Sequence, residues 1–213
     1  MKLTGGTPNI PFRDLAIQRR ESDLVGATFG RGFWILDDYS SLREVSAEVL
    51  EGEAALFSVR DADWYVPRPT LGGGGKASQG DSYYVAENPP FGATFTYYLR
   101  EGLKNRKAVR QEAEGKIAEE GGDTPTPGWD ALREEELAPN PSVELVVRDS
   151  QGALVRRLPG AAKKGLHRVT WDLRRPAVDA WSRGGGDERR GRGPEGVLTA
   201  PGTYTVSLRK QVE

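Results

Sequence analysis

Short apolar segments separated by polar or glycine-rich breaks dominate the chain, and this pattern predicts short strands joined by turns. Near the N-terminus the apolar segments are 15–17, 24–28 and 33–36, and the breaks between them suit hairpin connections. Three adjacent strands would leave two edges and one face unburied, so by themselves they would be marginally stable.

The C-terminal part alternates more regularly. The segment 142–149 places Val143, Leu145 and Val147 on one face. The same alternation of apolar and polar positions recurs in 91–99, 165–173 and 203–208, and a turn at 150–152 leads into another apolar segment, 153–158. Strands with one apolar and one polar face at short spacing are typical of a β-sandwich, so the expected fold class is all-β with at least five strands in this part.

Two stretches depart from the strand pattern. Residues 102–120 are rich in Arg, Lys, Glu and Ala, with Val109, Ala113 and Ile117 at every fourth position. This predicts a charged helix with a narrow apolar stripe and a largely solvated surface, and residues 131–137 add one or two further helical turns. The stretch 44–90 is less regular and is interpreted as an irregular crossover.

Composition excludes several classes of function. The chain has 30 Lys and Arg against 31 Asp and Glu, so a net charge of −1 gives no electrostatic case for nucleic acid or an anionic membrane. The absence of cysteine excludes disulfides, thiolate metal sites and cysteine nucleophiles, and leaves the compartment open. No apolar stretch approaches the ~20 residues of a membrane span, and residues 1–12 do not read as a secretory signal.

Few residues are candidates for chemistry. Asp37 and Asp38 could bind a cation, although neighbouring carboxylates at a strand end are usually turn residues. His167, the only histidine, could form a hydrolytic triad only with Asp172 and a serine. Five residues apart on one strand, His167 and Asp172 point to opposite faces, so we expect a packed or edge histidine instead.

The aromatic residues and the glycine-rich segments are also weak candidates for ligand binding. Trp171 could stack on a sugar, but Val169 and Leu173 share its face, so a core position is expected; Trp34 and Trp64 are expected to be more exposed. The glycine tract 72–75 lacks the remaining residues of a phosphate loop. The arginine–glycine segments 183–186 and 189–193 look like RNA-binding repeats, but the acidic residues 187–188 interrupt them, so a mobile loop between strands is expected.

The C-terminal motifs resemble a known domain type. Asp149 and Gly152 in a D-x-x-G turn, Trp171-Asp172, and Pro-Gly-Thr-Tyr at 201–204 are similar to the Ig-like domain at the C-terminus of flagellar hook-capping proteins. The resemblance covers about 93–210 and implies an Ig-like β-sandwich, with the charged helical insertion at about 102–137 and an Arg/Gly-rich insertion at 182–193. The same domain type recurs in many secreted bacterial proteins.

The N-terminal segment DLVGATFGRGFWILDD, residues 23–38, resembles the closing blade of sortilin-like β-propellers with BNR-type repeats, many of which are labelled glycosyl hydrolases. This resemblance implies that residues 1–43 are the remnant of the last blade of a longer chain. The crossover 44–90 and the Ig-like domain 91–213 would follow that blade. Trp34 and Trp64 would then help to cover the propeller. The Asp-box signature of such repeats is not found here.

The leading hypothesis is a non-catalytic C-terminal module of an exported bacterial protein, extracellular or periplasmic, that caps a propeller and contacts its remaining blades, with a protein or glycan as further partner. We assign no catalytic, cofactor-binding or metal-ligating residue. An accessory part of a carbohydrate-active propeller enzyme, with its catalytic residues outside this chain, is the alternative. Among 31 acidic residues some pair would match glycosidase spacing by chance. A carbohydrate-binding module is a third possibility.

Overall fold

The computed structural model of the chain describes residues 9–30, 32–66, 88–177 and 196–211. The expectation of a β-rich chain is confirmed, because most of its regular structure consists of strands in three small antiparallel sheets, with few helices. The described residues divide into two compact units, one within 1–49 and 69–89 and the other within 50–68 and 90–213.

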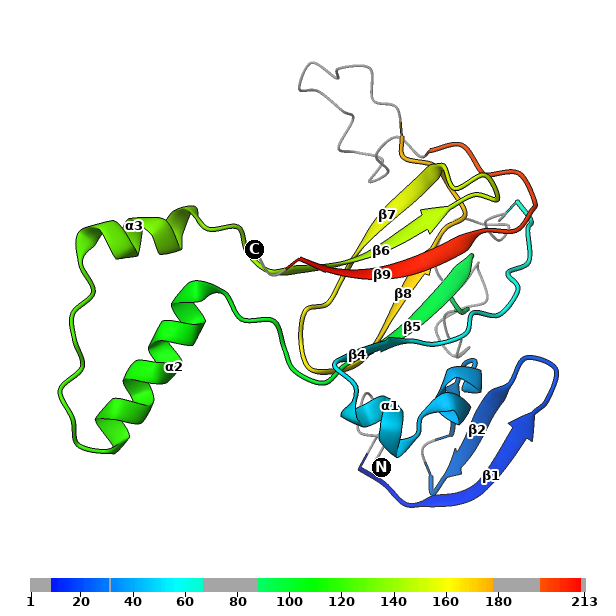
Figure 1. The fold of residues 1–213 in the computed structure, drawn as a ribbon. Helices are drawn as coiled ribbons and strands as arrows, with labels where there is room; N and C mark the ends of the chain where they lie inside the picture. Colours follow the sequence, from blue (N-terminus) through cyan, green and yellow to red (C-terminus); the bar gives the residue numbers. More distant parts are fainter. Residues whose placement is uncertain (1–8, 31, 67–87, 178–195, 212–213) are drawn as a thin grey trace, which may run out of the picture. The chain divides into compact units, whose positions relative to one another are not determined.

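The first unit contains the three strands predicted near the N-terminus: β1 (Phe12–Gln18), β2 (Asp23–Thr28) and β3 (Phe33–Leu36) (Figure 1). They form an antiparallel sheet in the order β1-β2-β3, so the predicted hairpins are confirmed. Gly30 and Gly32, in the break between β2 and β3, have φ angles of 73° and 78°, which side chains with a Cβ rarely adopt. A 3-10 helix (Ser40–Glu44) follows β3, and the helix α1 (Ala47–Glu51) spans the boundary between the units.

The second unit contains two antiparallel sheets. One has the order β4-β5-β8, formed by Ala54–Leu56, Ala93–Leu99 and Gly165–Trp171. The other has the order β7-β6-β9, formed by Leu154–Gly160, Ser142–Arg148 and Thr205–Gln211 (Figure 1). All the strands predicted in the C-terminal part are therefore present.

One hydrophobic core takes side chains from both sheets of the second unit. Tyr97 and Leu99 on β5 and Leu145 on β6 are completely buried. The alternation in the sequence identified these positions correctly, because every second residue of a strand points to the same side. The other buried members of the cluster are Phe95, Val143, Val147, Val155, Leu158, Trp171 and Leu173.

Two polar atoms in this core have well-placed partners. The Tyr97 hydroxyl donates to the carbonyl oxygen of Ala161 at 2.8 Å, and the Trp171 indole N–H donates to the carbonyl oxygen of Arg174 at 2.9 Å. An unpaired buried polar atom would cost about 1 to 3 kcal/mol, so these two bonds allow large aromatic rings with polar ends to be buried. Burial also raises the pKa of the Tyr97 hydroxyl above its ordinary value.

The predicted turn between β6 and β7 is confirmed in detail. The Asp149 carboxylate accepts hydrogen bonds from the backbone N–H groups of Gln151 and Ala153, at 3.0 and 2.9 Å. Gly152 completes the turn with a φ angle of 80°. The D-x-x-G motif thus acts here through an aspartate that binds its own backbone.

The structure differs from the sequence interpretation inside the crossover 44–90. Residues Ala54–Leu56 form β4, which pairs with β5, and the following Phe57 is buried. A strand of three residues is too short to show alternation in the sequence, so only its pairing with β5 in the structure identifies it. The glycine tract 72–75 lies outside the described residues.

The charged insertion contains the two predicted helical segments, α2 (Arg106–Glu119) and α3 (Trp129–Leu137). The side chain of Asn105 accepts from the backbone N–H of Ala108 at 2.9 Å and caps the start of α2. Gly121, with a φ angle of 77°, follows the last turn, as expected for a helix end. Neither helix has a buried residue, which agrees with the predicted solvated surface.

Replacing Leu145 by alanine should destabilise the second unit by about 2 to 5 kcal/mol, because it leaves a cavity in a fully packed core. Leu154→Ala is the matched control: Leu154 is 45% exposed on β7, and its loss should cost about 0.5 kcal/mol. Urea unfolding followed by tryptophan fluorescence measures both changes. Equal losses for the two variants would contradict the assignment of the core.

Candidate functional site

The three-stranded sheet of the first unit has an apolar face that remains exposed. Leu15, Gly26 and Trp34 lie opposite one another in the register of β1, β2 and β3 and therefore share one face. Leu15 is 61% exposed and Trp34 40%. A Cβ on Gly26 would lie 2.6 Å from the ring of Phe12, which places this ring over the strand on the same face. Two residues further along each strand, the same face carries Ile17, Leu24 and Leu36.

The opposite face of this sheet carries apolar side chains in its middle and polar ones, Asp14, Gln18 and Asp23, toward the ends of β1 and β2. Ala16, Val25 and Ile35 share it, and Ala27 lies across from Phe33, which is 75% exposed. A surface sheet of a globular protein normally alternates between one apolar and one polar face. We name the two faces of β1-β2-β3 together the bare sheet. The bare sheet thus leaves large apolar side chains exposed on both faces, among them Leu15 on one and Phe33 on the other.

Asp37 and Asp38, the candidates for a cation, follow β3 directly. The Asp38 carboxylate accepts from the backbone N–H and the hydroxyl of Ser40, at 3.2 and 2.5 Å. The backbone N–H of Asp38 donates to the Asp23 carboxylate at 3.0 Å, which joins this turn to β2. Asp38 is thus a turn residue, as expected. In the described part of the chain, no three or more carboxylates and imidazoles gather into a metal-binding group.

His167 and Asp172 are not brought together, which agrees with their predicted positions on opposite faces. The imidazole ring of His167 packs against Tyr97 with ring centroids 5.2 Å apart, and its Nε2 lies 2.5 Å from the carbonyl oxygen of Lys163. The Asp172 carboxylate accepts from the backbone N–H of Arg174 at 3.0 Å. Both side chains therefore have structural partners that are unrelated to a triad.

The tryptophans lie as expected. Trp171 is buried and contacts the ring of Tyr204 edge to face, with centroids 5.3 Å apart, so it belongs to the core. Trp64 is 47% exposed, and its indole N–H donates to the carbonyl oxygen of Thr199 at 2.9 Å. This bond joins Trp64 to the segment that precedes β9, and both lie within the second unit. The arginine–glycine segments 183–186 and 189–193 lie outside the described residues.

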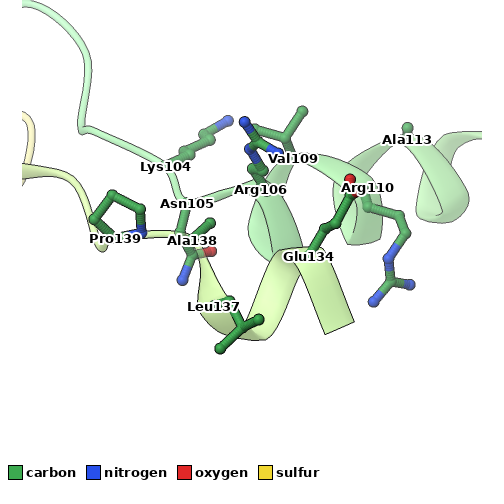
Figure 2. Close-up of a pocket in the computed structure, with 10 residues that line it drawn as sticks. All are labelled: Lys104, Asn105, Arg106, Val109, Arg110, Ala113, Glu134, Leu137, Ala138 and Pro139. Atoms are coloured by element: carbon green, nitrogen blue, oxygen red, sulfur yellow. The ribbon is translucent and has the colours of Figure 1, made fainter. Parts of the chain in front are cut away.

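A groove of about 650 Å³ lies between α2 and α3 and was not singled out from the sequence. Figure 2 shows its lining, which comes from both helices and from the segments that lead into α2 and out of α3. Val109 and Ala113, two members of the predicted stripe, belong to this lining together with Leu137. The apolar stripe on α2 therefore predicted one wall of the groove. Nothing in the sequence indicated that α3 would pack beside this stripe and supply the other wall.

An ion network joins the two helices beside this groove. Arg110 donates to the Glu135 carboxylate on α3 through Nε and Nη2, at 2.6 and 3.1 Å, and to Glu114 through Nη1 at 2.7 Å. These hydrogen bonds raise the pKa of Arg110 and, despite partial desolvation, lower the pKa of Glu135 below its ordinary value of 4.5. A bidentate arginine–carboxylate pair fixes the orientation of one helix on the other.

Comparison of the chain with protein-family models, with curated proteins and with solved structures finds no match. Within the described ranges, none of the helices has the length and apolar character needed to cross a bilayer. The bare sheet is therefore the candidate site, on the basis of its geometry alone, and the groove between α2 and α3 is a second exposed apolar surface.

The Glu135 carboxyl should titrate with a midpoint below 4.5, because its charged form is stabilised by Arg110. The contribution of this carboxylate to the pairing of α2 and α3 is then present at neutral pH and is lost as the pH falls through that depressed pKa. NMR titration of the Glu135 side chain measures the midpoint. Arg110→Gln should move it back toward 4.5, whereas Arg133→Gln on α3 should leave it in place; no movement in Arg110→Gln would contradict the assigned cause.

Proposed function

We propose that the chain is a non-catalytic structural and interaction module that caps a β-propeller, with the bare sheet serving as part of the last blade. The observation that carries this proposal is the presence of large exposed apolar side chains on both faces of β1-β2-β3. The partner is thus a second sheet of the same kind, supplied by the neighbouring blades of a longer chain.

The geometry of propellers supports this choice of partner. Blades are sheets of typically four strands arranged around a central channel, so each blade packs against a neighbour on either side. A blade consequently needs two apolar faces, whereas a sheet that packs on only one layer needs one. The bare sheet meets this requirement and has one strand fewer than the usual blade among the described residues. Trp34 then becomes a contact between blades.

The second unit supports the other half of the proposal, an Ig-like β-sandwich attached to the blade. Two antiparallel sheets of three strands contribute to one core, and the motifs on which the resemblance depends lie in the turn between β6 and β7, at the end of β8 and just before β9. The proposed export of the parent protein, to the periplasm or outside the cell, depends on the resemblance alone. The accessory role in a carbohydrate-active enzyme stays a prediction, because no described contact favours it.

Hydrogen exchange tests the proposed blade. In this chain alone, the amides of β1 and β3 should exchange at least about tenfold faster than those of β6, because the bare sheet is short and uncovered. In the full-length product of the parent gene they should become protected, while the rates in β6 stay unchanged. Fast exchange in β1 and β3 of the full-length product, or a parent gene without further blades, would overturn the proposal.

The sandwich is tested with two fragments. Residues 50–213 should unfold cooperatively, because they keep β4 and Phe57 in contact with β5. Residues 91–213 lack both and should unfold at a lower denaturant concentration with the same far-ultraviolet strand signal. If neither fragment shows a cooperative transition while the whole chain does, the second unit is no independent sandwich.

A further inference from the structure

The outer edge of β1 in the bare sheet is protected against pairing with a further strand. Its pairing with β2 shifts register between Phe12 and Asp14, as at a bulge, and Pro11 precedes the strand. The Asp14 carboxylate accepts from the backbone N–H of Leu15 at 2.8 Å, so this donor already has a partner. Bulges, charged side chains and prolines are the features by which natural proteins protect the free edge of a sheet. An incoming strand therefore finds little to pair with on β1.

The outer edge of β3 lacks these features. Its four residues, Phe33–Leu36, are all apolar and pair with β2 without a register shift. In the same register, the backbone N–H of Thr28 donates to the carbonyl oxygen of Gly32 at 3.1 Å, which makes these two residues a hydrogen-bonded pair. Hydrogen-bonded and non-hydrogen-bonded pairs alternate along an antiparallel ladder. Phe33 and Ile35 therefore direct their backbone N–H and C=O groups away from β2.

These outward groups of Phe33 and Ile35 form a ready template for a strand. In the part of the chain that the structure describes, no hydrogen bond outside the β2 ladder reaches them. The end of β3 is held in place, because the backbone N–H of Asp38 donates to the Asp23 carboxylate at 3.0 Å. An edge that is already fixed in the extended conformation needs no further ordering when another strand pairs with it.

We propose that this open edge of β3 (the outward backbone groups of Phe33 and Ile35) pairs with one further strand, supplied by the longer parent chain. The inference rests on the proposed function and deepens it, because it states which edge of the bare sheet the parent chain extends. The described residues form three strands, whereas a blade typically has four. Main-chain hydrogen bonds would hold the added strand, as in other cases of strand addition.

The side chains of β3 define the chemistry of the added strand. Trp34 on one face and Ile35 on the other are both apolar, and both are exposed at this edge. Side chains on neighbouring strands contact one another across the ladder, so a charged residue beside either of them would gain no partner. The added strand is therefore expected to be apolar on both faces, with β-branched or aromatic residues, rather than to alternate between apolar and charged positions.

Residue-resolved hydrogen exchange separates this inference from the proposed function. In the full-length product of the parent gene, an added strand should slow the exchange of the outward amides of Phe33 and Ile35 at least about a hundredfold relative to this chain alone. The outward amide of Ile17 on β1 should gain at least about tenfold less protection. Protection of Trp34 and Leu36 without Phe33 and Ile35 would overturn the inference but keep the proposed blade, whereas no protection in β3 would overturn both.

A proline substitution tests the edge directly. Ile35→Pro removes an outward donor and spares the β2 ladder, a position at which edge strands tolerate proline. In the full-length product it should lower the protection of Phe33 relative to Trp34 by about tenfold or more. Ile17→Pro makes the same change on the other edge and should alter this ratio by less than about twofold.

Two results would contradict the added strand. One is an unchanged protection ratio of Phe33 to Trp34 in the Ile35→Pro variant. The other is slow exchange of Phe33 and Ile35 in this chain alone, because the chain itself or a second copy would then occupy the edge. The comparison of the unmodified proteins keeps the test decisive if Ile35→Pro does not fold.

Discussion

The fold of the second unit depends on burying Tyr97 and Trp171 in a core to which both of its sheets contribute. Each sheet has only three strands, and isolated sheets of this size are close to the limit of stability. Their stability must come from the shared burial of apolar side chains, which is the main favourable contribution to folding. The polar ends of both aromatic rings bind backbone carbonyls, so the burial adds hydrophobic area without leaving an unpaired donor.

The described residues of the bare sheet form no comparable buried core, although its strands also carry large apolar side chains. Its register is fixed by ladder hydrogen bonds and by the turn in which Asp38 binds Asp23, and its large side chains stay exposed on both faces. Under the proposed function, this exposed apolar surface is where a neighbouring blade packs. The two units therefore differ in one respect: the sheets of the second unit share a buried core, whereas large apolar side chains of the bare sheet stay exposed.

What the sequence predicted correctly follows from side-chain alternation. Val143, Leu145 and Val147 were assigned to the core because the side-chain period of a strand is two, and all three are buried. β4 was missed because three residues carry no period, and its existence depends on pairing with β5. The inward position of Arg156 was missed for a related reason: the bulge at Val147 turns this side chain inward, and a bulge interrupts the alternation on which such predictions depend.

Arg156 has a structural role as an inward-pointing charge on the edge strand β7. Charged side chains on edge strands, especially inward-pointing ones, prevent the strand from pairing with another sheet, and β7 is an edge strand. This role accounts for arginines at 156 and 157 in general, since any charge on β7 would serve it.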